Sequence, residues 1–230
     1  MAKRIFDLTV ATLLLVLSLP VLAMTALAIL LTMGRPILFR QLRPGLQGRP
    51  FEILKFRTMV NEGPDDRPDQ DALRLTRLGR FLRNTSIDEL PQLWNVIRGD
   101  MSLVGPRPQL MRYYPLYSPW HRRRHEALPG ITGLAQIRGR NAISWDERLD
   151  LDVWYVDHRS FWLDLKILFQ TLPAVIQRKG ITAAGRATMV EFQGSASPAA
   201  EAPETAPAVA CSASSRTHEA EGALELNSVA

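Results

Sequence analysis

Two neighbouring carboxylates, Asp88 and Glu89, are the side chains of this 230-residue sequence that most readily suggest chemistry. They lie in "TSIDELP", directly after Thr85 and Ser86. Ser86 and Glu89 have the S-x-x-E spacing of a capping box, which predicts that a helix begins here. A helix N-terminus also attracts anions through its free N–H groups, so the same position suits a phosphate site. The local pattern by itself favours the helix cap.

Several cations in or beside loops accompany the acidic pair. Arginine holds phosphate oxygens in bidentate fashion, and glycine and proline loops allow a ligand to approach the backbone closely. Each cation by itself is typical of a solvated surface. Together with the acidic pair they indicate a diphosphate site with Mg²⁺, which binds through one or two carboxylates plus substrate phosphates. These cations are Lys55, Arg57, Arg83, Arg107, Arg138 and Arg140.

The remaining residue types argue against other site chemistry. The histidines have no metal-ligand spacing, and the sequence contains neither of the glycine-rich nucleotide fingerprints. Its single cysteine, Cys211, allows no intramolecular disulfide, which fits a reducing compartment. Without the tail from Ser195 onward, 27 basic and 18 acidic residues remain, a net charge of +9. This charge predicts anionic partners: nucleic acid, anionic lipid or phosphorylated substrates.

Residues 8–34 contain no charged residue and are long enough for a membrane helix. A cleaved signal peptide is disfavoured because the run is long and the following sequence is basic. Pro20 divides the run into two arms of about a dozen residues, each roughly 18–20 Å long, and neither alone crosses a hydrocarbon core of about 30 Å. Proline kinks or breaks a helix, and Ser18 can bond a carbonyl that is freed.

Basic residues flank both ends of the apolar run. Lys3 and Arg4 precede it, and Arg35, Arg40 and Arg43 follow it. Because basic residues favour the cytoplasmic side, both ends are expected there. The sequence therefore predicts that residues 1–35 form a re-entrant hairpin, which enters one leaflet and returns; a proline-kinked span is the alternative.

Residues 36–193 predict a small α-rich α+β domain with a few short strands. The polar stretch 61–71 is typical of an exposed loop. Two segments, 72–84 and 160–180, predict amphipathic or apolar helices at a membrane surface, although the first is equally typical of a soluble helix with a basic face. Residues 194–230, rich in Ala, Pro, Ser and Glu, are predicted to be disordered.

Longer motifs point to a known family. In order along the chain are "KRIFD", the apolar run broken at Pro20, "RPG", "KFRTM", "SIDELPQLWNVIRGDMSLVGPRP" and "PGITGLAQIRGRNAISW". From residue 3 to about 190 the chain resembles the bacterial sugar transferases that are monotopic phosphoglycosyl transferases. The "GRNAISW…LDLDVWYV" region resembles the PglC-type enzymes, which transfer phospho-diacetylbacillosamine for glycoprotein assembly.

The resemblance implies a reaction and its residues. A UDP-sugar and polyprenyl (undecaprenyl) phosphate would yield polyprenyl diphosphate sugar and UMP through a covalent phosphosugar–enzyme intermediate. Asp88 would be the nucleophile and the Mg²⁺ ligand, and Glu89 its catalytic neighbour. UDP-diacetylbacillosamine is the first expected donor and another UDP-N-acetylhexosamine the second. The expected phosphate or uridine contacts are Lys55, Arg57, Arg83, Arg107 and Arg140.

The resemblance also implies a location, on the cytoplasmic face of the bacterial inner membrane. Lys3, Arg4 and Asp7 would anchor the hairpin at the interface, and Pro20 would form its break. The family commonly has serine directly before this proline, whereas this chain has Leu19 there and its nearest serine is Ser18.

The expected partners are the UDP-sugar, polyprenyl phosphate and membrane lipid, without nucleic acid; the oligomeric state stays open. Two alternatives are kept. One is a hexose-1-phosphate transferase of exopolysaccharide synthesis, although such enzymes usually carry extra N-terminal spans. The other is a non-catalytic membrane-anchored adaptor that binds anionic lipid or nucleic acid.

Overall fold

The computed structural model describes residues 1–60, 74–139, 143–176 and 191–194. The chain divides into two units, Met1–Pro198 and Ala199–Ala230. The second unit and the predicted loop at 61–71 lie outside the described residues. Within the described part, the helices are α1 (Ala2–Met33), α3 (Arg77–Thr85), α4 (Gln92–Arg98), α5 (Pro119–Arg122), α6 (Leu134–Arg138), α7 (Trp145–His158) and α8 (Phe161–Ile176). The strands are β1 (Leu38–Pro44), β2 (Pro50–Phe56), β3 (Ser102–Val104) and β4 (Gly130–Thr132).

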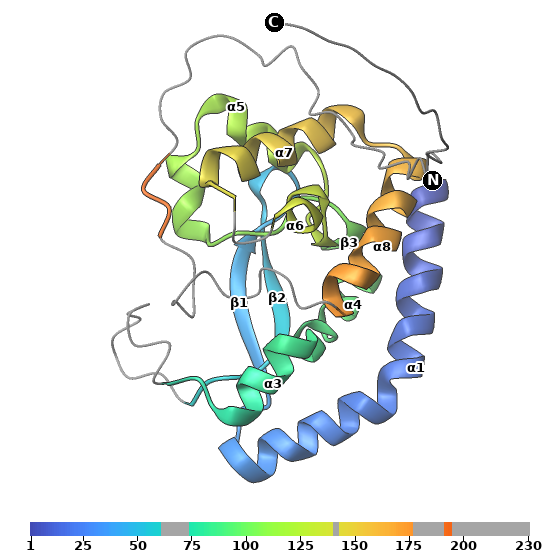
Figure 1. Ribbon diagram of the computed structural model, residues 1–230, viewed down its shortest axis with the longest axis vertical. Coiled ribbons are helices and arrows are strands. Elements are labelled where there is room, and N and C mark those ends of the chain that lie inside the picture. Colours follow the sequence, from blue (N-terminus) through green and yellow to red (C-terminus); the bar gives the residue numbers. More distant parts are fainter. Residues whose placement is uncertain (61–73, 140–142, 177–190, 195–230) are drawn as a thin grey trace, which may run out of the picture. The chain divides into compact units, whose positions relative to one another are not determined.

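The apolar run forms one continuous helix, α1, which bends near its middle (Figure 1). Pro20 lies inside this helix and explains the bend, because proline lacks an N–H and its ring crowds the preceding turn. The Ser18 hydroxyl donates to the carbonyl of Leu15 at 3.0 Å. The expected break at Pro20 is therefore a bend within a single helix, and the re-entrant hairpin stays a prediction.

α1 is long and apolar enough to cross a membrane, the one such helix in the described part of the chain. Only 11% of its most apolar stretch is buried within the protein. A core helix of a soluble domain would be mostly buried, so α1 is not one. Its exposed face includes Leu13, Leu14, Leu17, Met24 and Leu31.

The opposite face of α1 packs against the rest of the protein. In the first arm of the helix, Phe6, Val10 and Ala11 join the main hydrophobic core. In the second arm, Ile29 packs in a separate cluster with Phe56 of β2 and Leu82 of α3. α1 is thus part of the domain it anchors, because both of its arms contribute to the hydrophobic clusters.

A buried polar network fixes the first turns of α1. Lys3 Nζ lies 2.5 Å from Asp164 Oδ2 on α8, and the hydroxyl of Tyr155 donates to the other Asp164 oxygen at 2.6 Å. Asp7 is buried and accepts a hydrogen bond from the Ser102 hydroxyl at 2.8 Å. Two buried carboxylates are thereby satisfied, as buried polar groups must be.

Arg4 provides a second connection between α1 and the domain. Its guanidinium donates to the carbonyls of Val96, at 2.7 Å, and Ile97, at 3.0 Å, near the end of α4. These carbonyls belong to the last turn of a helix, which favours a cation. The structure therefore places Lys3, Arg4 and Asp7 in contacts within the protein, and their expected role as anchors at the lipid interface stays a prediction.

We expect Asp164→Asn to loosen the docking of α1. Asparagine can still accept from Tyr155, but it offers Lys3 no charge; because Lys3 is partly exposed, the loss is moderate, about 1–2 kcal/mol. The midpoint of thermal unfolding in detergent micelles should fall by roughly 3–6 °C. Glu52→Gln, which removes the charge of an exposed pair with Arg40, is the matched control. Equal midpoints for both variants would contradict this role.

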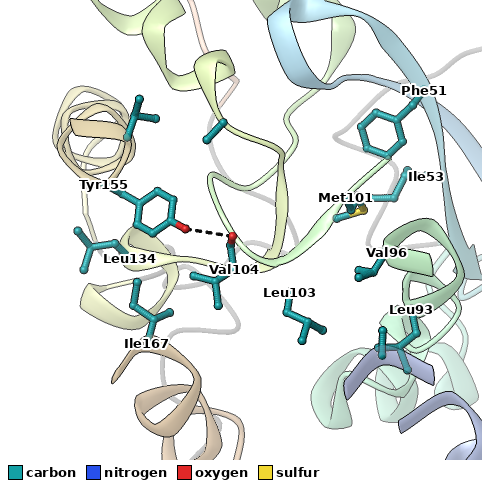
Figure 2. Packing of buried hydrophobic residues seen from close by; sticks show 13 residues of the cluster. Phe51, Ile53, Leu93, Val96, Met101, Leu103, Val104, Leu134, Tyr155 and Ile167 are labelled. Carbon is teal, nitrogen blue, oxygen red and sulfur yellow. Dashed lines mark hydrogen bonds between the residues drawn. The ribbon is translucent and has the colours of Figure 1, made fainter. Parts of the chain in front are cut away.

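The small sheets position the site. β1 and β2 form an antiparallel hairpin whose turn contains Gln47 and Gly48 at positive φ, and β3 pairs with β4 in parallel. Between these elements and the helices lies the main core (Figure 2). It joins Phe51 of β2, Val96 of α4, Val104 of β3 and, among others, Tyr155, Leu134 and Ile167. The expected helix-rich domain with a few short strands is confirmed.

The two segments expected at a membrane surface both contain helices, α3 and α8. α8 runs beside the first arm of α1 (Figure 1), where Phe6 and Phe161 pack edge to face at 5.3 Å. Farther along, Trp162 and Phe169 are exposed by 79% and 70%. Trp162 and Phe169 are seven positions apart, about two turns, and so lie on the same side of α8.

Candidate active site

Asp88 and Glu89 lie in a single 3-10 turn, Ile87–Glu89, between α3 and α4. The expected capping box does not form: the Ser86 side chain makes no capping hydrogen bond, and its backbone is left-handed (φ 57°) where α3 ends. The following α-helix begins only after Pro91. Proline fits the start of a helix because it has no N–H to satisfy, so the acidic pair precedes the helix.

Glu89 is held by two cations. Its Oε1 accepts a hydrogen bond from Lys55 Nζ at 2.8 Å and another from the Arg107 guanidinium at 2.6 Å. Burial by itself would raise the pKa of Glu89, but Arg107 and Lys55 outweigh burial and hold this pKa well below its usual range. Glu89 is therefore ionised at neutral pH, and its charge is already engaged by Lys55 and Arg107.

Asp88 has the opposite environment. Its side chain is buried, and no described residue donates a hydrogen bond to it. Burial, followed by the charge of Glu89, raises the pKa of Asp88 to about 6, although Lys55, Arg83 and Arg107 oppose the shift. Asp88 is thus ionised at neutral pH with its oxygens unengaged. Two adjacent carboxylates whose environments separate their pKa values commonly have different roles in a site.

Three of the predicted cations gather at the acidic pair. Lys55 comes from β2 and Arg107 from the loop after β3, and both bind Glu89. Arg83, in the last turn of α3, is near enough to lower the pKa of Asp88, and its Nε donates to Thr58 Oγ1 at 3.0 Å. Burial lowers the pKa of Lys55, and Glu89 opposes this shift.

The remaining two of the five expected phosphate or uridine contacts, Arg57 and Arg140, have different outcomes. Arg57 is buried, and its guanidinium donates to the carbonyls of Met33, Gly34 and Arg35 at the end of α1. This gives Arg57 a structural role at the C-terminus of the membrane helix, and its expected contact with substrate stays a prediction. Arg140 lies outside the described residues.

Sequence reasoning missed Asn95 on α4, which is fully buried. Its Oδ1 accepts from the backbone N–H of Leu54 at 3.0 Å, and its Nδ2 donates to the carbonyl of Glu52 at 2.7 Å. Asn95 therefore pairs with the edge of β2 as a neighbouring strand would. It fixes the strand that carries Lys55 against the helix that follows Glu89. The sequence signal that could have indicated Asn95 was a single amide side chain within the apolar stretch "LWNVI".

We expect Asn95→Ala to destabilise the protein by about 2–3 kcal/mol, because a buried N–H and a buried carbonyl lose their partner. The thermal midpoint in micelles should fall accordingly. Arg98→Lys, an exposed substitution on the same helix, should shift the midpoint little. A midpoint of Asn95→Ala that matches the wild type would exclude this bridging role.

The site suits a magnesium ion that arrives with substrate. Asp88 offers an unengaged carboxylate, and the described residues contain no group of three or more His, Cys, Asp or Glu side chains that could hold a metal. Mg²⁺ commonly binds one or two carboxylates and takes its other ligands from water and substrate phosphates. The donor set fits that arrangement, with Asp88 as the protein ligand.

An unengaged carboxylate among cations, in a domain that carries an exposed apolar helix, is consistent with a membrane-associated group-transfer enzyme. Residues 1–178 match the family described as bacterial sugar transferase. The chain therefore belongs to the bacterial sugar transferase family, as its motifs predicted. It is a phosphoglycosyl transferase, which rules out the non-catalytic adaptor.

Individual relatives narrow the range of reactions to be considered within this family. The chain is 53% identical over 195 residues to the uncharacterized sugar transferase EpsL of Bacillus subtilis (strain 168), covering 84% of this chain and 96% of that protein. It is 48% identical to a UDP-glucose:undecaprenyl-phosphate glucose-1-phosphate transferase of Caulobacter vibrioides, covering 76% and 69%. A protein of the same name in Escherichia coli K12 is 41% identical, covering 74% of this chain and 39% of that protein.

Proposed function

We propose that the protein transfers a hexose 1-phosphate from a UDP-hexose to undecaprenyl phosphate and releases UMP. The observation that carries the proposal is the buried carboxylate of Asp88, unengaged beside a Glu89 held by two cations. The names of the Caulobacter and Escherichia relatives support a hexose donor. They favour the alternative of the sequence analysis over UDP-diacetylbacillosamine.

The chemistry needs two displacements at one phosphorus. A carboxylate oxygen of Asp88 attacks the sugar-bearing phosphorus, the bond to the bridging oxygen breaks, and UMP leaves with that electron pair. An oxygen of undecaprenyl phosphate then attacks the same phosphorus. The bond to Asp88 breaks, the carboxylate is regenerated, and the product is undecaprenyl diphosphate hexose.

The neighbours of Asp88 provide the electrostatic environment. Glu89 holds the cationic ends of Lys55 and Arg107 at the place where the diphosphate charge must lie. Preorganised cations of this kind stabilise charge that develops on a leaving group. Mg²⁺, bound by Asp88 and the diphosphate, would neutralise phosphate charge and stabilise the departing UMP.

The experiment is a comparison of UDP-sugars. Purified protein in micelles receives undecaprenyl phosphate and, separately, UDP-glucose, UDP-galactose, UDP-N-acetylglucosamine or UDP-diacetylbacillosamine, with Mg²⁺ or with a chelator. We expect Mg²⁺-dependent UMP release that is fastest with a UDP-hexose. Fastest release with UDP-diacetylbacillosamine would restore the first expectation, and no release with any donor would refute the proposal.

The rate should depend on the ionisation of Asp88. Because burial and Glu89 raise the pKa of Asp88 to about 6, the nucleophile becomes protonated as the pH falls through this value. We expect the single-turnover rate of UMP release to be level above pH 7 and to fall about tenfold per pH unit below pH 6. Release that stays level down to pH 4.5 would contradict the assigned nucleophile.

For the membrane, we propose that α1 enters one leaflet and returns, on the cytoplasmic face. The bend and the exposed apolar face of α1 support this topology, as do the exposed aromatic residues of α8. The test is labelling of Ala2→Cys in a Cys211→Ser background, with Glu52→Cys as the cytoplasmic reference. Both positions should label from the cytoplasmic side only; labelling of position 2 from the periplasm would refute the re-entrant topology.

A further inference from the structure

The loop that carries Arg107 is held at successive backbone groups. The N–H of Gly105 donates to the carbonyl of Thr132 at 2.9 Å, and the carbonyl of Pro106 accepts from the N–H of Gly130 at 3.0 Å. Both contacts are with β4 and are made by backbone. The carbonyl of Arg107 itself is bound differently, since a side chain holds it.

That side chain is Arg124, which is 1% exposed. One of its terminal nitrogens donates to the Arg107 carbonyl at 2.7 Å and to Asp152 Oδ2 at 2.6 Å. Its Nε donates to the same Asp152 oxygen at 3.1 Å, and its guanidinium lies 5.5 Å from the ring centre of Tyr117. Arg124 thus joins α7, through Asp152, to the backbone of the site loop.

Stability alone does not explain why an ion pair is buried at this position. Removing two charges from water costs several kcal/mol, and apolar residues of similar volume often stabilise a core as well or better. An ion pair with fixed geometry can instead specify an orientation. The planar guanidinium of Arg124 has donors in a rigid fork, so an arginine held by Asp152 fixes the direction in which the Arg107 carbonyl must point.

Holding this carbonyl restrains the backbone of Arg107, which sets the direction in which its Cα–Cβ bond leaves the loop. The guanidinium of Arg107 lies 2.6 Å from Glu89 Oε1, next in sequence to the unengaged Asp88. The contacts therefore run from Asp152 through Arg124 and Arg107 to Glu89.

We propose that Asp152 and Arg124 are positioning residues that direct Arg107 at Glu89 for phosphosugar transfer. This inference rests on the proposed function. Neither residue is expected to touch substrate, and both act through Arg107. Small shifts in the position of a catalytic group cost large factors in rate, so the effect belongs to the chemical step.

The chain offers a matched control in the same two elements. Arg123, next to Arg124, forms an ion pair with Asp157 on α7, and both side chains are 34% exposed. Asp157→Asn removes an aspartate charge from the same helix. Asp157 pairs with Arg123, whereas Arg124 is the arginine that binds the loop carrying Arg107.

The test is a double-mutant cycle in micelles, with the UDP-hexose that supports turnover. Asp152→Asn should lower kcat at least about tenfold and leave KM within about twofold, and Arg107→Ala should lower kcat about a hundredfold. The double variant should be no slower than Arg107→Ala alone, within about twofold, because Asp152 acts only through Arg107. Asp157→Asn should retain wild-type kcat.

The variant Arg124→Lys tests whether a loss of activity could come from general destabilisation of the protein. Lysine keeps a charge opposite Asp152 but lacks the planar fork that also reaches the Arg107 carbonyl. We expect it to unfold in a cooperative thermal transition well above the assay temperature and still lose kcat at least about fivefold. Additive losses in the cycle, or wild-type kcat in Arg124→Lys, would overturn the inference. Failure of the proposed function is distinguishable, because then the wild type itself would release no UMP.

Discussion

Replacement of Asp88 by asparagine is expected to abolish the covalent phosphosugar–enzyme adduct and to lower UMP release by at least about 10³-fold. An amide has almost the same shape as a carboxylate but no anionic oxygen to attack phosphorus. Because no described residue donates a hydrogen bond to Asp88, the substitution leaves no donor without a partner. The protein should therefore fold normally and lose only its chemistry.

The measurement is the incorporation of label from a UDP-hexose that carries radioactive phosphorus next to the sugar, followed on denatured protein. Asp146→Asn, an exposed change in the first turn of α7, should label like the wild type. Retention of both label and turnover by Asp88→Asn would show that another residue is the nucleophile. A thermal midpoint measured on the same samples separates lost chemistry from lost structure.

Glu89→Gln is expected to have the second largest effect, a fall in kcat of about 10²–10³-fold, because Lys55 and Arg107 lose the charge that holds them. The substitution should also move the pH profile. Burial and the charge of Glu89 raise the pKa of Asp88; without that charge, and with two cations unneutralised, the pKa of Asp88 falls. The acid limb of the residual activity should therefore move below pH 6.

Rates of UMP release between pH 4.5 and pH 8 would test this. Glu52→Gln, the same change at an exposed strand position, should alter neither kcat nor the acid limb. An acid limb of Glu89→Gln that stays in place or moves to higher pH would contradict the electrostatic coupling within the pair. The direction of the shift is informative even where the residual rate is small.

Local patterns were sufficient for much of this protein. The motif around Asp88 and Glu89 identified the acidic pair and Arg107, and the motif "KFRTM" identified Lys55; the structure brings both cations to that pair. The uncharged run predicted α1, and Pro20 predicted its bend. These features depend on residue type and short spacing, because proline geometry, hydrophobic periodicity and motif order are properties of neighbouring residues.

Tertiary structure decided the roles within those patterns. Ser86 ends a helix where its spacing predicted a cap, and Arg57 binds the end of α1, a contact that its motif did not predict. Burial and the charge of Glu89 raise the pKa of Asp88, whereas Arg107 and Lys55, from distant parts of the chain, lower the pKa of Glu89. Residue type alone does not reveal which of two adjacent carboxylates is engaged.

Sequence patterns did not predict the contacts between residues that are far apart in the chain. Lys3 meets Asp164 across 161 positions, and Arg124 meets Asp152 across 28. Such partners come together only when helices pack, and no local periodicity specifies which charged residues of two helices will meet. The sequence by itself therefore determined the family, the long apolar helix and the acidic pair. The fold decided which carboxylate is unengaged, because desolvation and the placement of cations are properties of packing.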